Sequence, residues 1–188
     1  MAESKQNKSL IIFSKQDWLC YALIFAATIL SYWSVLSVDF VFDTPLNLHD
    51  AALQKYIQSI NLKSILTGSR AWTWLTFAFN YELSGLNPFW FRLTNVVINA
   101  LCGCAVYILV KQLAGLIEDK QHRWKQSEIS LEGVLIALFL VLHPISEFVT
   151  AYVVQRFVLL ATLFALISVS CLLQGLLTKN QSQIMASD

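Results

Sequence analysis

The chain has 188 residues, of which 56% are hydrophobic and 13% are charged, and its formal net charge at pH 7 is +1. Soluble globular domains carry about 25% charged residues, so this composition argues against a soluble domain and favours an integral membrane protein. A net charge so close to zero gives no reason to expect nucleic acid as a partner.

Four segments are predicted to cross a membrane. Residues 17–38, 89–112 and 147–177 each contain a charge-free run close to the ~20 residues that span the hydrocarbon core. Residues 129–146 form a shorter fourth span if Glu132 lies among the lipid head groups. Every backbone amide in lipid must be satisfied within a helix, so the predicted fold class is all-α, an integral membrane protein with four transmembrane helices.

Lysine and arginine counts near the span ends predict the orientation, because short cytoplasmic loops are enriched in these residues. Lysine and arginine are most frequent in the segment before the first span and in the loop between the second and third spans. Residues 1–16, 113–128 and 178–188 are therefore expected in the cytoplasm and residues 39–88 outside it, within a single membrane domain, residues 1–188. The first span is expected to remain as an anchor, since its apolar run is longer than that of a signal peptide.

The predicted outer loop, residues 39–88, contains two helical patterns. From Asp50 onward, apolar residues recur at the i, i+3, i+4, i+7 spacing of an amphipathic helix, which would lie along the membrane face. The segment 71-AWTWLTFAFNYELSG-85 has an apolar surface too broad for a helix in water. We therefore expect two juxtamembrane helices in this first extracytoplasmic loop.

Polar residues line one face of the second predicted span. Arg92, Asn95, Asn99 and Gly103 follow one another at intervals of three or four residues, so they share a helical face. A polar stripe with a small residue is either a helix-packing seam or the lining of a water-filled cavity, and the sequence leaves both open. The cysteines lie within predicted spans and lack metal-ligand spacing, so no metal site is expected.

Two segments of the sequence resemble a known protein family. The segments 69-SRAWTWLTFAFNYELSGLNPFWFRLTNVVINALCGCAVYILV-110 and 142-LHPISEFVTAYVVQRFVLLATLFALIS-168 resemble the N-terminal third of bacterial membrane proteins related to the TMTC O-mannosyltransferases. These are GT-C-fold glycosyltransferases that use polyprenyl-phosphate-linked sugars. The resemblance covers roughly residues 40–173 and implies a multi-pass protein of the bacterial inner (cytoplasmic) membrane. It agrees with the topology predicted from the charges, in which both termini are cytoplasmic.

The resemblance also implies roles for individual residues. Asp43 matches the first acidic residue of the family's Asp-Asp pair, which would act as general base toward an acceptor hydroxyl. Thr44 stands where the second acidic residue is expected, and Asn99 stands where the family often has a histidine. His143 and Arg156 are retained. The family's membrane part also has more spans than the four predicted here.

These departures favour a non-catalytic role. We expect a GT-C-glycosyltransferase-like membrane subunit that packs against or stabilises a larger membrane protein complex. The alternative is a glycosyltransferase, whole or split between chains, that transfers a sugar from a polyprenyl-phosphate donor to an extracytoplasmic acceptor; Asp43 would be catalytic only in that case. Membrane lipids and one or more other integral membrane proteins are the expected partners. No cofactor is expected, although a bound lipid or polyprenyl phosphate is compatible with either role.

Arg156 raises the sharpest question, because an arginine beside a long apolar run needs a partner. It could clamp a phosphate, form an ion pair with Asp43 or Glu147, or extend its guanidinium to the head groups. Similarly, His143 could be a turn residue or a ligand. The residues assigned to this polar cluster, which would either bind a lipid phosphate or hold the bundle together, are Arg70, Arg92, Asn95, Asn99, His143, Glu147 and Arg156.

Overall fold

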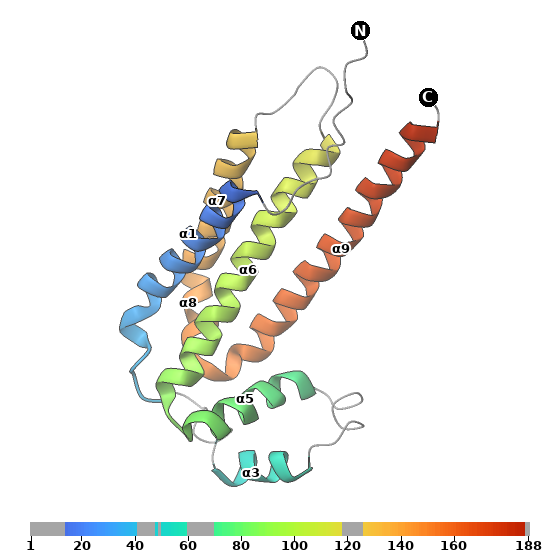
Figure 1. Cartoon of the computed structure of the whole chain (residues 1–188). Helices are drawn as coiled ribbons and strands as arrows, with labels where there is room; N and C mark the ends of the chain where they lie inside the picture. Colours follow the sequence, from blue (N-terminus) through green and yellow to red (C-terminus); the bar gives the residue numbers. More distant parts are fainter. Residues whose placement is uncertain (1–13, 41–47, 49, 60–69, 118–125, 187–188) are drawn as a thin grey trace.

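The computed structural model describes residues 14–40, 48, 50–59, 70–117 and 126–186, and every regular element in these ranges is helical (Figure 1). This confirms the all-α prediction for the described part of the chain. In chain order the elements are α1 (Lys15–Tyr32), the 3-10 helix η1 (Trp33–Val35), α3 (Asp50–Ser59), α5 (Ala71–Ser84), α6 (Pro88–Ile117), α7 (Gln126–Leu142), α8 (Pro144–Ala151), the 3-10 helix η2 (Val153–Gln155) and α9 (Arg156–Ala186).

Three helical segments are long and apolar enough to cross a membrane, namely Lys15–Val35, Pro88–Leu116 and Val153–Thr178. A fourth candidate consists of α7 and α8 together, which are bent by 58° with respect to each other. The structure therefore supports a helical membrane protein with three spans, or four if the bent pair crosses as one.

The bend between α7 and α8 follows from Pro144. The residue before a proline is disfavoured in the α region, and His143 adopts an extended conformation with φ −64° and ψ 139°. Pro144 then occupies the first turn of α8, where a missing N–H costs nothing. The predicted helices 129–146 and 147–177 thus differ from the observed elements, because the chain breaks at His143 and again between α8 and α9.

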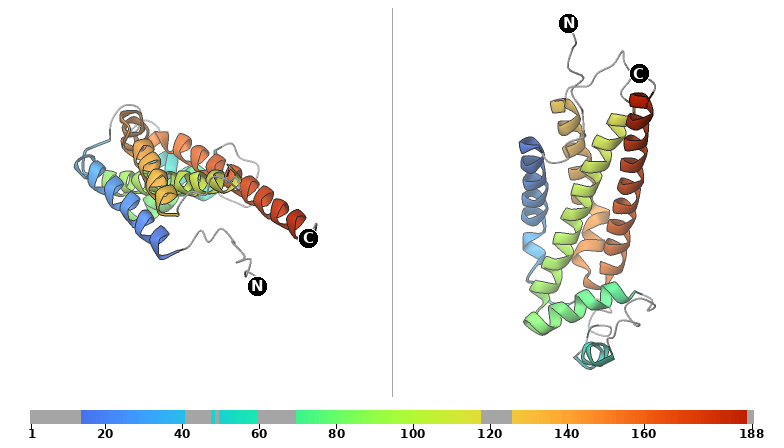
Figure 2. Two further views of the ribbon diagram at one scale, coloured as in Figure 1. Left: turned by 90° about the horizontal axis from the view of Figure 1, so that it is seen from above. Right: turned by 45° about the vertical axis from the view of Figure 1, so that its right-hand side comes forward.

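Helix α6 is the centre of the bundle. It packs against α1 and α7 on one side and against α9 on the other (Figures 1 and 2). In the most apolar stretch of each helix, 56% of the α6 residues are buried, compared with 11% in α9. Helix α9 is consequently held mainly by α6, and most of its circumference is left open.

Two glycines allow α1, α6 and α7 to approach closely. A Cβ added to Gly103 on α6 would lie 2.7 Å from Val141 Cγ1 and 2.9 Å from Ile24 Cγ2. A Cβ added to Gly133 on α7 would lie 2.9 Å from the ring of Tyr107. Small residues at such crossings let helix backbones meet in a membrane.

Helices α3 and α5 form a layer across the end of the bundle where α6 begins (Figure 2). Tyr56 of α3 donates its hydroxyl to the carbonyl of Ala71 at 3.0 Å, which ties α3 to the start of α5. Leu53 of α3 and Phe77 of α5 are fully buried in one apolar cluster with Phe91 of α6. Two helices, α3 and α5, are therefore present between the first and second candidate spans, packed on the end of the bundle.

Candidate functional site

The Arg156 side chain lies at the junction of α5, α6 and α9 and is fully buried. Its Nε donates to Asn95 Oδ1 at 2.7 Å and its Nη2 donates to the Phe91 carbonyl at 2.7 Å, both on α6. Its Nη1 donates to Asn80 Oδ1 at 2.7 Å and to Thr76 Oγ1 at 3.2 Å, both on α5. All four acceptors are neutral.

Two aromatic rings complete the surroundings of Arg156. Its Cζ lies 4.4 Å from the ring centre of Phe77 and 5.7 Å from that of Phe91, distances at which a guanidinium is attracted to the face of a ring. No carboxylate in the described part of the chain forms a hydrogen bond or ion pair with Arg156. Burial of a charge is costly unless its hydrogen bonds are satisfied, and here the chain itself supplies the acceptors.

This geometry bears on the three roles considered for Arg156. Arg156 is fully buried, whereas a guanidinium extended to the head groups would be exposed. Glu147, one of the two predicted ion-pair partners, is not among the residues that bind Arg156. Asp43 lies outside the described residues, so the predicted pairing with it stays a prediction. The donors that a phosphate would need are largely occupied by α5 and α6.

The polar face of α6 binds backbone carbonyl groups at the breaks between helices. A helix end exposes carbonyls with no intrahelical donor, and α8 ends at Ala151. The Asn95 amide donates to the Thr150 carbonyl at 3.2 Å and to the Val153 carbonyl at 3.3 Å. The same side chain accepts from Arg156, so one asparagine joins α6 to α8, η2 and α9.

The break after α7 is satisfied in the same way. The carbonyl of Val141, one turn before Pro144, accepts from Asn99 Nδ2 at 3.2 Å and from the Tyr32 hydroxyl at 2.9 Å. Nearby, Ser146 Oγ donates to the carbonyl of Leu140 at 2.6 Å. For Asn95, Asn99 and Gly103, the α6 face is therefore a packing seam, one of the two alternatives that the sequence left open.

Arg92 is the exception on this face. Its side chain is 2% exposed, its Nε donates to the Ala151 carbonyl at 3.2 Å and its Nη2 donates to the Asp39 carbonyl at 2.7 Å. Its Nη1 is buried and has no hydrogen-bond partner in the described residues. Arg92 also lines a cavity of about 360 Å³, together with Glu147.

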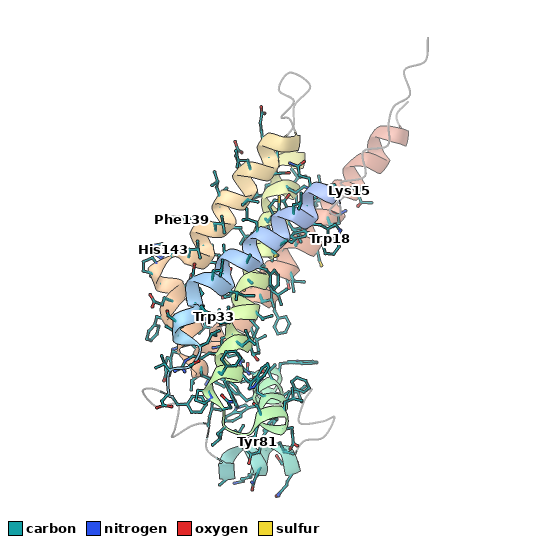
Figure 3. The ribbon with its side chains drawn as sticks, turned by 60° about the vertical axis from the view of Figure 1, so that its left-hand side comes forward. Lys15, Trp18, Trp33, Tyr81, Phe139 and His143 are labelled. Atoms are coloured by element: carbon teal, nitrogen blue, oxygen red, sulfur yellow. The ribbon has the colours of Figure 1, made fainter. Side chains whose placement is uncertain are left out.

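The remaining predicted site residues are spread over the same half of the molecule. Arg70 is exposed and precedes α5 with a positive φ of 61°, and its Cζ lies 4.9 Å from the ring centre of Phe157. His143 caps α8 by accepting from the Ile145 amide on Nδ1 at 3.2 Å, and its ring lies 5.4 Å from that of Phe139 (Figure 3). Its position is that of a turn residue.

In the described ranges, no group of three or more His, Cys, Asp or Glu side chains could hold a metal ion.

A second buried polar cluster lies near the start of α1, and it was not predicted from the sequence. Lys111 Nζ and the Tyr107 hydroxyl both lie 2.5 Å from Asp17 Oδ1, and all three side chains are buried. Asp17 is also the N3 residue of a capping box with the N-cap Ser14, because its Oδ2 accepts from the amide and hydroxyl of Ser14 at 2.9 and 2.7 Å. Two features of the sequence could have predicted this cluster. The Ser-x-x-Asp pattern is a variant of the capping box, and Tyr107 and Lys111 are one helical turn apart.

Comparison with known proteins finds no family model, no curated protein and no solved structure that matches this chain. The resemblance to GT-C glycosyltransferases therefore stays a prediction.

Proposed function

We propose that this chain is a non-catalytic, GT-C-glycosyltransferase-like membrane subunit that packs against a larger membrane protein complex. The observation that carries the proposal is the open circumference of α9, of whose apolar span only 11% is buried. A helix in this position has one side on α6 and a broad face available to a second membrane protein.

The open face of α9 has the composition of a helix-packing surface. Its exposed small residues Ala161, Ala165, Ser168 and Gly175 follow at intervals of four, three and seven, which places them on one side of the helix. A Cβ added to Gly175 would meet nothing within 4 Å, so packing among the described residues does not require this glycine. Interfaces between membrane helices are enriched in small residues, because these let two backbones come close.

The polar cluster supports the non-catalytic part of the proposal. A glycosyltransferase must present polar groups to a lipid phosphate, a sugar and an acceptor in a fixed geometry. Arg156, Asn95 and Asn99 instead donate to side chains and backbone carbonyls of the chain itself. These hydrogen bonds favour a structural role for the cluster over the alternative, a whole or split glycosyltransferase.

The proposed setting is the bacterial inner membrane, with α7 and α8 forming the fourth span and both termini in the cytoplasm. The α3–α5 layer would then lie on the extracytoplasmic face. Exposed aromatic side chains at this end, including Trp72 at 56% and Trp90 at 46% exposure, support contact with the membrane interface, where tryptophan is enriched.

The partner interface can be tested by co-purification of the full chain from its native membrane in mild detergent. Gly175→Leu and Ala165→Leu should reduce a stoichiometric membrane partner at least tenfold, because both fill the exposed face of α9. Leucine has a higher helix propensity than glycine, so Gly175→Leu should not unfold the helix. Ala26→Leu, at an exposed position on α1, is the matched control and should leave the partner bound. Equal recovery from all three variants, or a wild-type chain that purifies alone, would contradict the proposal.

Orientation and activity need separate experiments. In a chain without native cysteines, a membrane-impermeant thiol reagent applied from outside should label Cys at position 59 and not at position 121. The opposite pattern would reverse the proposed topology.

For activity, Asp43→Asn should leave cellular glycan transfer unchanged; a loss of transfer with normal protein levels would restore the glycosyltransferase alternative.

A further inference from the structure

The cavity beside Arg92 is formed where the end of α1 meets α6 and α8. Its volume is about 360 Å³, and most of its wall is apolar, with Val35 from η1, Val38 shortly after it and Phe148 from α8. Two charged side chains, Arg92 and Glu147, are part of the same wall. The cavity therefore combines an apolar surface with one cation and one anion.

Arg92, a residue of this wall, has hydrogen-bonding capacity that the described residues leave unused. Two of its nitrogens donate to backbone carbonyls, whereas Nη1 is buried without a partner in the described part of the chain. No ion pair involving Arg92 is present among these residues. A buried donor left unpaired loses its hydration without compensation, so an acceptor brought by a ligand would satisfy it.

The depth of Arg92 in the membrane indicates where such an acceptor would come from. The candidate span Pro88–Leu116 has 29 residues, which corresponds to about 44 Å at about 1.5 Å per residue. The hydrocarbon core is about 30 Å thick, so roughly one turn at each end of α6 lies at head-group level. Arg92 is the fifth residue of α6 and lies at that boundary. This placement depends on the span alone and is independent of the proposed partner interface.

We propose that this cavity binds a phosphoethanolamine group, as carried by phosphatidylethanolamine. The phosphate accepts from Arg92 Nη1, because guanidinium groups bind phosphate oxygens well. The primary ammonium donates to the exposed carboxylate of Glu147, and the first part of an acyl chain lies against Val35, Val38 and Phe148.

Glu147 is the reason for choosing a zwitterion. A carboxylate on the wall repels a head group with a net negative charge, whereas it attracts one that carries an ammonium beside its phosphate. A primary ammonium can also donate hydrogen bonds to a carboxylate, and a trimethylammonium cannot. The cavity should therefore prefer phosphatidylethanolamine over both phosphatidylglycerol and phosphatidylcholine.

The test is native mass spectrometry of the delipidated full chain in mild detergent, titrated with these three lipids carrying identical acyl chains. We expect the wild-type chain to retain phosphatidylethanolamine at least tenfold more than either competitor. Glu147→Gln should abolish that preference and raise retention of phosphatidylglycerol. Ala151→Leu, which fills the cavity, should reduce retention of all three.

Arg92→Gln should also lose lipid, but it removes the hydrogen bonds to Ala151 and Asp39, so Glu147→Gln and Ala151→Leu decide the test. The matched control is Arg70→Gln, an arginine in the same half of the molecule that does not line the cavity; it should bind lipid like the wild type. Competition with soluble phosphoethanolamine distinguishes the source: weaker binding than the lipid assigns the membrane, and stronger binding assigns a free metabolite. Equal retention of the three lipids by the wild type, or unchanged selectivity in both deciding variants, would overturn the proposal.

Discussion

Two buried cations, one near each end of α6, are accommodated in different ways. Lys111 is 2.5 Å from the carboxylate of Asp17, so its charge is neutralised directly. Arg156 contacts neutral oxygens and aromatic rings, and no carboxylate pairs with it in the described residues. Both side chains are nonetheless almost completely buried.

The difference reflects the chemistry of the two side chains. A lysine ammonium is a compact, strongly hydrated charge, whereas a guanidinium spreads its charge over a plane with five N–H donors and can stack on a ring. Lys111 therefore needs one carboxylate, which Asp17 in the first turn of α1 provides. Arg156 needs several acceptors in a plane, and two other helices have to be positioned to provide them. The Arg156 end should consequently depend more on tertiary packing than the Lys111 end.

The largest expected effect is at Arg156. Arg156→Leu leaves the oxygens of Asn95 and Asn80 unpaired and removes the hydrogen bonds that join α5 to α9, so it should lower the free energy of unfolding by about 3–5 kcal/mol, since each unsatisfied acceptor costs about 1–3 kcal/mol. Arg156→Lys keeps the charge but not the planar fork, and should recover less than half of the loss. SDS titration of the purified chain in mixed micelles measures both. Near-wild-type stability of Arg156→Lys would show that charge alone suffices and would remove the contrast with Lys111.

Removing the carboxylate at the other end should have a smaller effect. Asp17→Asn keeps an oxygen that can accept from Tyr107 or Lys111, but it replaces a charged acceptor of the buried ammonium with a neutral one, which should cost about 2 kcal/mol. The double variant Asp17→Asn with Lys111→Met should restore most of the loss in the same SDS titration, since removing both charges avoids an unpaired one. Failure of this rescue would argue that the ion pair is not what stabilises this end.

Tyr107→Phe tests the neutral part of the Asp17 cluster. It removes one hydroxyl donor while Lys111 remains 2.5 Å from the carboxylate, so the expected loss is about 1 kcal/mol. The ring itself should stay in place because it packs on Gly133 and Tyr21. A loss as large as that of Asp17→Asn would mean that the hydroxyl, and not the ammonium, is the main partner of the carboxylate.

The smallest effect is expected at Asn99. Its amide and the Tyr32 hydroxyl donate to the same carbonyl, that of Val141, so Asn99→Ala leaves this carbonyl with a donor and should cost about 0.5 kcal/mol. Asn99→Ala combined with Tyr32→Phe should cost more than the sum of the single changes, because only then is the carbonyl unpaired. Additive losses in SDS titration would contradict this shared role.

The long apolar runs determined the helical membrane character, because the length of a span and the need to satisfy its backbone are local properties. The spacing of Arg92, Asn95 and Asn99 similarly indicated a shared helical face. The sequence did not reveal that this face donates hydrogen bonds to backbone carbonyls at the breaks between helices. It also treated residues 147–177 as one helix, although Asn95 holds a break between α8 and α9 by binding the Thr150 and Val153 carbonyls.

The sequence by itself determined that the chain is helical, apolar enough for a membrane, and has an arginine beside a long apolar run. Only the tertiary structure decided the partners of that arginine. Thr76 lies 80 residues away and Asn95 lies 61 residues away along the chain, and no local pattern links residues at such separations. Hydropathy is a sum over neighbours in sequence, whereas a buried hydrogen bond depends on where three separate helices place their atoms. The same reason explains why the unpaired nitrogen of Arg92 and the cavity beside it became visible only in the folded chain.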